Sequence, residues 1–394
     1  MSTELENVKK QEEEYSASNI QVLEGLEAVR KRPAMYIGDI GEKGLHHLVY
    51  EVVDNSIDEF IMGAGRQIDI TLADNVVTVR DYGRGIPLKS LAAAVGQMNT
   101  GGKYGGDAFK KTVGLNGVGV KAVNMLSEEF TARSVRDGEA RTVTFAKGLE
   151  VSDRWESGVN EKNGTFISYR VDKEIFGEYA YNLEYVEQKI RNYSYLNLGL
   201  TLNFNGKSYV SKNGLLDLVN DNMTEDPLYP PIHLTGEDIE VVITHGTGYG
   251  ESYDSFVNGQ HTTQGGTHQS AFKEHIARTI KEHFGKYEYA DIRNGLVAAI
   301  AINVEEPVFE SQTKIKLGST VMAPGAETIN KYVGDFIKQN VDNYLHIHKE
   351  DCADILETKI KESERERKAM AGVTKLARER SKKANLHNLS LIHI

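Results

Sequence analysis

The chain has 394 residues, which exceeds the size of one ordinary hydrophobic core and predicts two domains. With 40% hydrophobic and 26% charged residues and no long apolar run, the composition is typical of a soluble globular protein and excludes a membrane-spanning helix. The net charge of −11 argues against affinity for nucleic acid over the whole surface, although a local basic patch stays open.

The opening residues and the cysteine usage indicate the compartment. Residues 1–14 are polar and mostly acidic, so they predict no secretory signal peptide. The single cysteine, Cys352, excludes an internal disulfide and a cysteine-based zinc cluster. Together these features predict a cytoplasmic protein that is not associated with a membrane.

The first half of the chain predicts helices and strands around an unusual glycine-dense stretch. A helical pattern ends before Pro33, because proline cannot continue a helix. The turn residues 73–75 separate two short strands. The predicted segments are helices over 18–29 and 45–62, strands over 67–72 and 76–80, and the glycine-dense stretch 83–119.

The second half predicts two groups of elements separated by Thr224–Pro231, a polar and acidic segment with two prolines. Because helices and strands occur in mixed order rather than as a regular βαβ series, we expect an α+β fold. The predicted segments are strands over 131–134, 141–145 and 165–169, a helix over 185–193, a strand over 239–244, a helix over 271–284, a strand over 295–304 and helices from 326 onward.

The C-terminal region combines a basic helical pattern with an apolar end. Ten Lys and Arg stand against five Glu over 357–383, which fits either a basic patch or a solvated helix with i,i+4 ion pairs. Residues 389–394 are apolar, unlike the helix before them. We interpret them as a non-native tail at the end of a truncated gene.

Polar side chains share one face of the predicted helix over 45–62. Glu51, Asn55 and Asp58 are spaced i, i+4 and i+7, which places them on the same side. A carboxylate and an amide together can activate water and ligate Mg²⁺ through oxygen. A surface helix with an acidic stripe would show the same pattern.

The segment Asp81–Pro87 directly follows a predicted strand and contains Asp-x-Gly-x-Gly. Glycines there permit a tight turn and the close approach of a planar ligand. Asp81 at the strand end could accept a hydrogen bond from an exocyclic amine such as that of adenine. An ordinary Asp-Gly turn is the alternative.

Two glycine-rich segments follow. Thr100–Gly106 resembles a mobile lid that carries a cation, Lys103, and Gly114–Lys121 runs into a helical pattern whose free amides would suit phosphate oxygens. A flexible surface loop is the alternative. A Walker A loop is excluded because Thr201 stands where Gly206-Lys207-Ser208 would require a glycine. The order of elements also excludes a dinucleotide-binding fold.

Taken together, the acidic-Asn helix, Asp-x-Gly-x-Gly, glycine-rich lid and Gly-x-Gly resemble the Bergerat fold of the GHKL ATPases. That group contains type II topoisomerases, MutL repair proteins, chaperone ATPases and histidine kinases. The resemblance implies ATP and Mg²⁺ as cofactors. It makes Glu51 the general base, Asn55 the Mg²⁺ ligand and Asp81 the adenine acceptor. The other implied nucleotide contacts are Thr165, Gly85, Ile86, Gly102, Lys103, Leu115, Asn116, Gly117, Val118 and Gly119.

Further motifs resemble one branch, the B subunits of bacterial type IIA topoisomerases (gyrase B and topoisomerase IV B). They are Tyr15–Ile20, Leu23–Gly38, Ser255–Gly259, Gly265–His268 and Phe309–Lys314. The resemblance implies that Gln312 and Lys314 act on the γ-phosphate and that Tyr15 belongs to a dimerisation arm. It implies a Bergerat α/β sandwich followed by a ribosomal-protein-like βαβ transducer. The expected limits are 1–18 for the arm, 19–230 for the ATPase domain, 231–388 for the transducer and 389–394 for the tail.

The implied function is an ATP-driven clamp that dimerises on binding ATP and acts on double-stranded DNA with a topoisomerase A subunit in an A2B2 assembly. This chain would hydrolyse ATP without cleaving DNA. A MutL-like repair ATPase and a non-catalytic nucleotide sensor or DNA-binding scaffold are the alternatives; Glu51 argues against the second. Asn116 and Val171 depart from the residues common in gyrase B. The sequence leaves gyrase and topoisomerase IV open, because residues before Glu59 resemble the first and residues after it the second.

Overall fold

The computed structural model describes residues 25–98, 100 and 117–390, with side chains as far as residue 378. The described residues form two compact units. The first unit comprises 25–59, 69–98, 100 and 117–183, and the second comprises 60–68 and 184–390. The domain limits expected from the sequence, 19–230 and 231–388, remain predictions.

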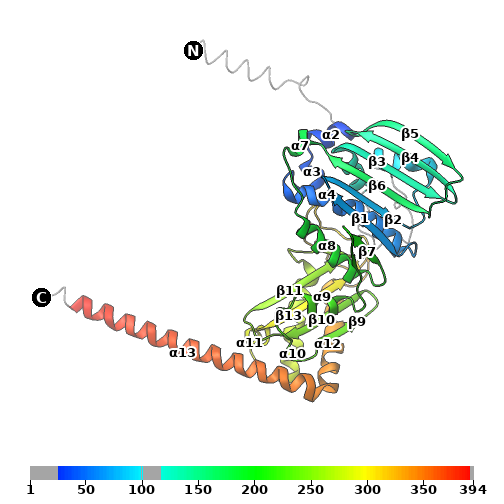
Figure 1. Cartoon of the computed structure of the whole chain (residues 1–394). Coiled ribbons are helices and arrows are strands. Elements are labelled where there is room, and N and C mark those ends of the chain that lie inside the picture. Colours follow the sequence, from blue (N-terminus) through cyan, green and yellow to red (C-terminus); the bar gives the residue numbers. More distant parts are fainter. Residues whose placement is uncertain (1–24, 99, 101–116, 391–394) are drawn as a thin grey trace, which may run out of the picture. The chain divides into compact units, whose positions relative to one another are not determined.

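The first unit contains short helices, one long helix and most of a large sheet (Figure 1). Its helices are α2 (Gly25–Lys31), α3 (Ala34–Ile37), α4 (Glu42–Ile61), η2 (Leu88–Ser90), α5 (Leu91–Gly96), α6 (Gly119–Met125) and α7 (Lys173–Phe176). Its strands are β1 (Gln67–Ala73), β2 (Val76–Asp81), β3 (Ser127–Arg136), β4 (Glu139–Ala146), β5 (Leu149–Ser157) and β6 (Gly164–Val171).

The second unit contains the remaining strands and the longest helices. Its helices are α8 (Leu183–Leu196), α9 (Leu215–Asn222), α10 (Thr267–Phe284), α11 (Tyr289–Arg293), α12 (Ile329–Ile347), η4 (Lys349–Ala353) and α13 (Asp354–Ser390). Its strands are β7 (Thr201–Phe204), β8 (Lys207–Tyr209), β9 (Ile232–Thr235), β10 (Ile239–His245), β11 (Glu251–Val257), β12 (Gln260–His261) and β13 (Leu296–Ile302).

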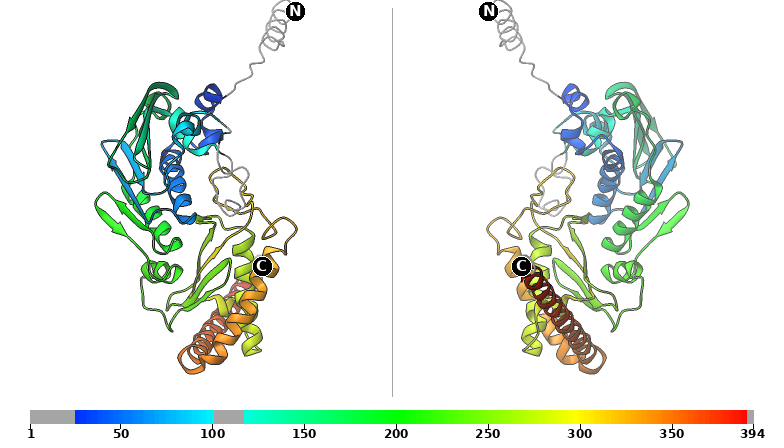
Figure 2. Two further views of the ribbon diagram at one scale, coloured as in Figure 1. Left: turned by 90° about the vertical axis from the view of Figure 1, so that its right-hand side faces the viewer. Right: turned by 90° about the vertical axis from the view of Figure 1, so that its left-hand side faces the viewer.

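Helices cover one face of the sheet in the first unit, as the side views of Figure 2 show. The strand order is β5-β4-β3-β6-β2-β1-β7-β8. Along β2, Val77, Val79 and Asp81 are buried while the residues between them are half-buried. This alternation is expected of a sheet with one covered face, because successive side chains point to opposite sides. Asp81 therefore points toward the helices.

The sheet of the second unit is covered on both faces. Its strand order is β12-β11-β13-β10-β9, and β11 pairs with β13 in parallel, which requires the crossover through α10. Val241 and Ile243 belong to the core cluster that includes residues of α10 and α12. Val242, between them, packs in a separate cluster with Leu218 and Val219 of α9. Burial on both sides of β10 explains its three consecutive apolar residues, Val241 to Ile243.

The β11–β12 connection is a two-residue turn at Asn258-Gly259. Both residues have positive φ, 49° and 79°, as the favoured hairpin turns require. The Asn258 side chain donates to the Val304 carbonyl at 2.8 Å and accepts from the Val304 N–H at 2.7 Å. These two bonds attach the turn to the residues that follow β13.

Gly206-Lys207-Ser208 lies in the β7–β8 hairpin, with Asn205 and Gly206 at its tip. The phosphate-binding loop of a Walker A motif would instead lead into a helix. The exclusion of that motif is therefore confirmed.

The first half of α13 is attached to the second unit by polar contacts. Arg367 donates to both carboxylate oxygens of Asp291, at 2.7 and 2.8 Å. Within α13, Lys361 pairs with Glu357 and Lys368 with Glu364 at i,i+4 spacing, which supports the solvated-helix interpretation of this region.

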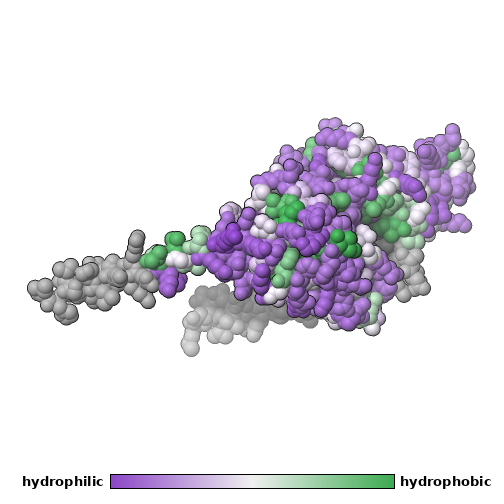
Figure 3. Space-filling model, turned by 90° about the horizontal axis from the view of Figure 1, so that it is seen from below, coloured by the Kyte–Doolittle hydropathy of each residue, from purple (hydrophilic) through white to green (hydrophobic). Residues whose placement is uncertain are grey.

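The face seen in Figure 3 is mostly hydrophilic, with several apolar patches, one of which lies on the extended part of α13. The exposed large apolar residues described in that helix are Ile355, Met370, Val373 and Leu376. Within the described part of the chain, no helix is long and apolar enough to cross a membrane.

Candidate functional site

Glu51 occupies the middle of α4 and is 7% exposed. His47, one turn earlier on the same helix, places its Nε2 atom 3.2 Å from Glu51 Oε1. The i,i+4 spacing puts both side chains on one face. The imidazole thus lies directly beside the carboxylate. A buried, oriented carboxylate is the geometry that a general base requires.

Gly119, the first residue of α6, lies directly against this carboxylate. A Cβ atom on residue 119 would stand 1.8 Å from Glu51 Oε2, so only glycine fits without displacing the acid. The preceding residues predicted to contact phosphate, Gly117 and Val118, lead into the same helix, and Gly117 has a φ of 59°. The structure thus brings the predicted base and the end of the predicted phosphate loop together.

Asn55 follows Glu51 by one turn of α4 and is exposed. Its Nδ2 donates to the Glu51 carbonyl at 2.7 Å. Because this bond uses the nitrogen, it distinguishes the two ends of the carboxamide, of which the oxygen is the kind of atom that ligates a hard cation.

Asp81 ends β2 and lies between α4 and β6. Its Oδ1 accepts from the backbone N–H of Gly83 at 2.9 Å and of Thr165 at 3.1 Å. Ser56 Oγ lies 3.4 Å from Oδ2, a long contact that satisfies this oxygen less well. Oδ2 is therefore the oxygen better placed to accept a hydrogen bond from a ligand.

Burial raises the pKa of Asp81 above its ordinary value, and the two backbone N–H donors oppose this shift only in part. The carboxylate is 5% exposed. Its charge is balanced mainly by dipoles rather than by an ion pair. A further hydrogen-bond donor, such as the amine of a ligand, would stabilise the ionised form of this carboxylate.

The loop after Asp81 approaches the backbone of β3 closely. Gly85 has a φ of 75°, and a Cβ there would stand 2.7 Å from the Val135 carbonyl oxygen. Ser134 Oγ donates to the Ile86 carbonyl at 2.7 Å. These contacts place Gly85 and Ile86 against β3, whose Ser134 is the register partner of Thr165 in β6.

Two polar side chains of α6 are buried behind this loop region. Lys121 donates through Nζ to the Thr100 carbonyl. Asn124 donates to the Val95 carbonyl at 3.0 Å. They connect α6 to α5 and the residues that follow α5, and so fix the helix whose first residue contacts Glu51.

Gln312 and Lys314 lie in the second unit, in the long connection between β13 and α12. Lys314 is buried and has a φ of 57°, a left-handed conformation that is uncommon outside glycine. Its N–H donates to the Ser311 carbonyl at 3.0 Å and closes a turn. A non-glycine residue in this conformation often marks a functional turn.

This connection is fixed within the second unit by the segment that precedes α10. Gln264 N–H donates to the Ile315 carbonyl at 2.9 Å, and Leu317 N–H donates to the Gly265 carbonyl at 3.1 Å. A Cβ on Gly266 would lie 2.6 Å from the Leu317 carbonyl oxygen. The residues that directly follow the Phe309–Lys314 motif are therefore in contact with the start of the Gly265–His268 motif.

Several predicted residues lie outside the described residues. They are Tyr15 in the arm, Gly102 and Lys103 in the lid, and Leu115 and Asn116 in the phosphate loop. Their assignments remain predictions.

The sequence interpretation missed His47 and Ser56, which contact Glu51 and Asp81. The i,i+4 spacing of His47 and Glu51 was visible in the sequence. The contact of Ser56 with Asp81 was not, because it depends on how α4 lies against β2.

Two known families match the chain, each over a different segment. The family described as "Histidine kinase-, DNA gyrase B-, and HSP90-like ATPase" matches residues 40–172, which contain Glu51 and Asp81. The family described as "DNA gyrase B" matches residues 202–374, which contain Gln312 and Lys314. The B subunit of DNA topoisomerase 4 from Borreliella burgdorferi is 42% identical over 377 residues, covering 94% of this chain and 61% of that relative.

The chain belongs to the gyrase B and topoisomerase IV B family of type II topoisomerase subunits. The B subunit of DNA gyrase from Staphylococcus epidermidis is 38% identical over 342 residues, which cover 78% of this chain and 53% of that relative. The chain thus spans little more than half the length of these relatives.

Two solved structures share the fold. The 43K ATPase domain of Thermus thermophilus gyrase B has a TM-score of 0.68 at 29% identity, over 90% of this chain and 98% of that one. The ATPase region of Saccharomyces cerevisiae topoisomerase II has a TM-score of 0.69 at 21% identity, over 84% of this chain and 99% of that one. At this identity the likeness shows the fold alone. The predicted α+β fold class is confirmed, and the topoisomerase interpretation is favoured over the MutL-like alternative.

Proposed function

We propose that this chain is the ATP-binding and ATP-hydrolysing region of a type IIA topoisomerase B subunit. The observation that carries the proposal is the contact of Glu51 with His47 on one side and Gly119 on the other. In this arrangement Glu51 accepts the proton of the attacking water while His47 holds its carboxylate in place. The start of α6 faces the same position and suits the phosphate that the water attacks.

The adenine contact is assigned to Asp81. An exocyclic amine that donates to Oδ2 would supply the donor that this buried carboxylate lacks, and Thr165 assists through the N–H that fixes Oδ1. Gly85 and Ile86 would line the base, since the close approach of this loop to β3 leaves no room for a larger side chain at residue 85.

A Mg²⁺ ion fits the donor set of α4. Asn55 would ligate it through Oδ1, with nucleotide phosphate oxygens and water completing the oxygen ligands that this ion prefers. When bound, the ion neutralises charge on the phosphates. Gly102, Lys103 and residues 115–119 would hold the same phosphates.

Residues of the second unit would distinguish ATP from ADP. By family resemblance, Gln312 and Lys314 act on the γ-phosphate, and the fixed turn at Ser311–Lys314 gives Lys314 a defined backbone conformation for that role. A contact made only with ATP would favour one conformation of the whole region, which is how nucleotide could drive clamp closure.

The partners follow from the family. We expect ATP-dependent homodimerisation through the Tyr15 arm, capture of double-stranded DNA, and assembly with the topoisomerase A subunit as A2B2 in the cytoplasm. Supercoiling, relaxation or decatenation would belong to that complete assembly. Relaxation assays with an A subunit would separate this function from a MutL-like repair ATPase.

ATP hydrolysis by the purified chain and by Glu51→Gln tests the proposal. We expect the substitution to lower the single-turnover rate on the order of 10²–10⁴-fold, the usual contribution of a general base, while nucleotide binding measured by calorimetry changes little. The exposed Glu27, which pairs with Lys31 on α2, provides the control Glu27→Gln and should behave as wild type. Equal losses of binding and turnover would show that Glu51 is structural.

A further inference from the structure

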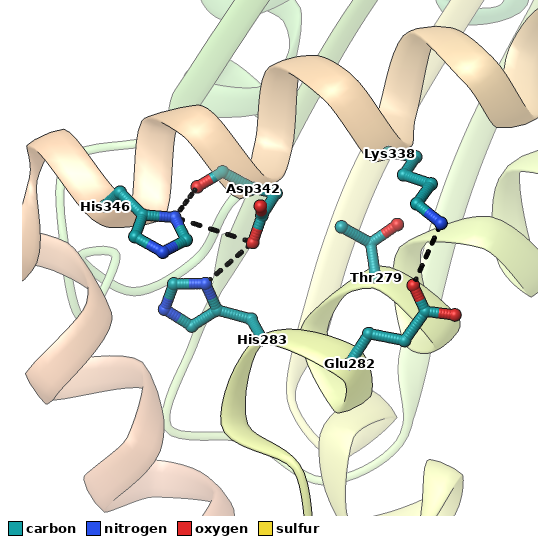
Figure 4. A pocket seen from close by; sticks show the side chains of 6 residues that line it. All are labelled: Thr279, Glu282, His283, Lys338, Asp342 and His346. Carbon is teal, nitrogen blue, oxygen red and sulfur yellow. Dashed lines mark hydrogen bonds and ion pairs between the residues drawn. The ribbon is translucent and has the colours of Figure 1, made fainter.

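Three potential metal ligands converge between α10 and α12 in the second unit. His283 lies in the last turn of α10, and Asp342 and His346 are spaced i,i+4 on α12. Figure 4 shows both imidazoles directed toward the Asp342 carboxylate. One ligand atom from each residue lies within 4.8 Å of the others.

The distances approach those of a coordination shell. His283 Nδ1 lies 2.8 Å from Asp342 Oδ1, and His346 Nδ1 lies 3.6 Å from the same oxygen. In a tetrahedral site with metal–ligand bonds of about 2.1 Å, ligand atoms are roughly 3.4 Å apart. The two observed distances bracket this value, so small rotations of the side chains would suffice to form the site.

We propose that His283, Asp342 and His346 bind a divalent transition-metal ion, with Zn²⁺ as the best match. Two imidazoles and one carboxylate are a donor set that Zn²⁺ accepts and that Mg²⁺ does not favour. The site would therefore be separate from any Mg²⁺ held with nucleotide. Three protein ligands leave one tetrahedral position for water, and exposure of the His346 side chain gives the ion a path from solvent.

The surroundings allow a cation to bind. Lys338 is the neighbouring cation in this hollow, and Glu282 neutralises it through an ion pair of 3.4 Å (Figure 4). Without metal, His283 shares a hydrogen bond with the Asp342 carboxylate, and His346 Nδ1 bonds to the Asp342 backbone carbonyl at 2.8 Å. A metal would replace both bonds with stronger ones.

The consequence is a cross-link between two helices that are distant in sequence. α10 and α12 pack side by side over one face of the second unit's sheet, and their buried residues share one core cluster. Because metal binds the folded arrangement and not the unfolded chain, its binding would stabilise the second unit.

Titration of the metal-stripped, nucleotide-free chain with Zn²⁺ tests this proposal. We expect one equivalent to bind by calorimetry in the presence of excess Mg²⁺, and a higher melting temperature. Co²⁺ in place of Zn²⁺ should give the visible absorption of a four- or five-coordinate ion. His346→Ala should weaken binding by at least about tenfold. His346 is an exposed helix residue, so this variant should fold as wild type.

His275→Ala is the matched control, because His275 lies on α10 two turns before His283 and bonds to Asn330 rather than to the cluster. It should bind Zn²⁺ as wild type does. Equal zinc affinity in the His346→Ala and wild-type chains, or no binding by the wild type, would overturn the proposal. None of these measurements depends on ATP hydrolysis, so the site can fail without affecting the proposed function.

Discussion

Each unit buries a carboxylate, and the two are stabilised in different ways. Asp291, in the second unit, is 2% exposed and is held by both arms of the Arg367 guanidinium. Asp81, in the first unit, is nearly as buried, yet its described hydrogen-bond donors are two backbone amides and one distant hydroxyl. The oxygens of Asp291 have strong donors within the protein, which indicates a structural role. Asp81 can accept a further hydrogen bond, which indicates a ligand.

The histidines of the second unit extend this contrast. His245 is fully buried, accepts from the Tyr229 hydroxyl at 2.6 Å and donates to the Ile292 carbonyl at 2.7 Å, which fixes one neutral tautomer. Burial lowers the pKa of His245 to about 4 and that of His268 to about 3. Burial thus favours the neutral form of these two histidines in the second unit, whereas Asp81 in the first unit is a buried carboxylate opposed mainly by backbone N–H dipoles.

After Glu51→Gln, Gly119→Ala should give the largest effect in the first unit. The methyl group would displace the Glu51 carboxylate, since it would lie 1.8 Å from Oε2. Misplacement of a catalytic group by about 1 Å costs on the order of 10²-fold in rate, so single-turnover ATP hydrolysis should fall by that factor. Gly372→Ala on α13, where a Cβ would meet nothing within 4 Å, is the control. An active Gly119→Ala chain would show that the observed Glu51 position is not the catalytic one.

Asp81→Asn should affect nucleotide affinity, whereas Asp291→Asn should affect stability. Asp81→Asn should weaken nucleotide binding by roughly 1–3 kcal/mol, because its NH₂ can face the ligand donor. The pKa of Asp81 is raised by burial, so its ionised form costs stability at neutral pH, and the variant should unfold at the same temperature or higher. Asp291→Asn should lower the free energy of unfolding by about 1–3 kcal/mol and leave nucleotide affinity unchanged.

Calorimetric titration and thermal unfolding of both variants measure these outcomes. If Asp81→Asn lost stability as Asp291→Asn does, Asp81 would be a second structural carboxylate and the contrast between the units would disappear.

Acid should destabilise the second unit. The pKa of His245 in the folded chain, about 4, lies below its ordinary value of 6.5, so protonation favours the unfolded chain. Stability should fall as pH decreases from 6.5 toward 4, by about 1.4 kcal/mol per pH unit. In His245→Gln, whose amide can still donate to Ile292, urea unfolding followed by circular dichroism should show a shallower dependence on pH. An unchanged slope would contradict the assignment of a neutral His245.

Among the substitutions of residues assigned to the nucleotide, Lys314→Ala should have the smallest effect on nucleotide affinity. If Lys314 acts only on the γ-phosphate, ADP should bind the variant within about twofold of wild type, while a non-hydrolysable ATP analogue should no longer produce dimers. Small-angle scattering with each nucleotide measures this difference. Dimerisation of the variant to the wild-type extent would leave Lys314 as a buried turn residue without a role in coupling.

The sequence predicted strongly periodic elements well and weakly patterned ones poorly. It located α4, β1, β2 and α10 within a few residues, because their apolar residues are regularly spaced. It missed β5, which is exposed along nearly its whole length. It also missed β11, which begins with the polar residues Glu251 to Asp254. Neither strand has a clear apolar alternation.

The candidate sites show the same difference between what local sequence patterns reveal and what they do not. Glu51 and Asp81 were found because they belong to short local motifs. The group of His283, Asp342 and His346 could not be found, because 59 residues separate the first two and only the packing of α10 on α12 brings them together. Local spacing reveals ligands on one element, and tertiary packing is needed for ligands on two.

The Asn258-Gly259 turn affects how the protein ages in storage. Asn-Gly sequences deamidate readily, because the glycine nitrogen attacks the carboxamide and forms a succinimide. At Asn258 that attack must first break both hydrogen bonds to Val304, and the side chain is 7% exposed. Asn205-Gly206 is exposed at the tip of the β7–β8 hairpin. Isoaspartate should therefore accumulate at residue 205 well before residue 258, and the five-stranded sheet should keep its turn as the sample ages.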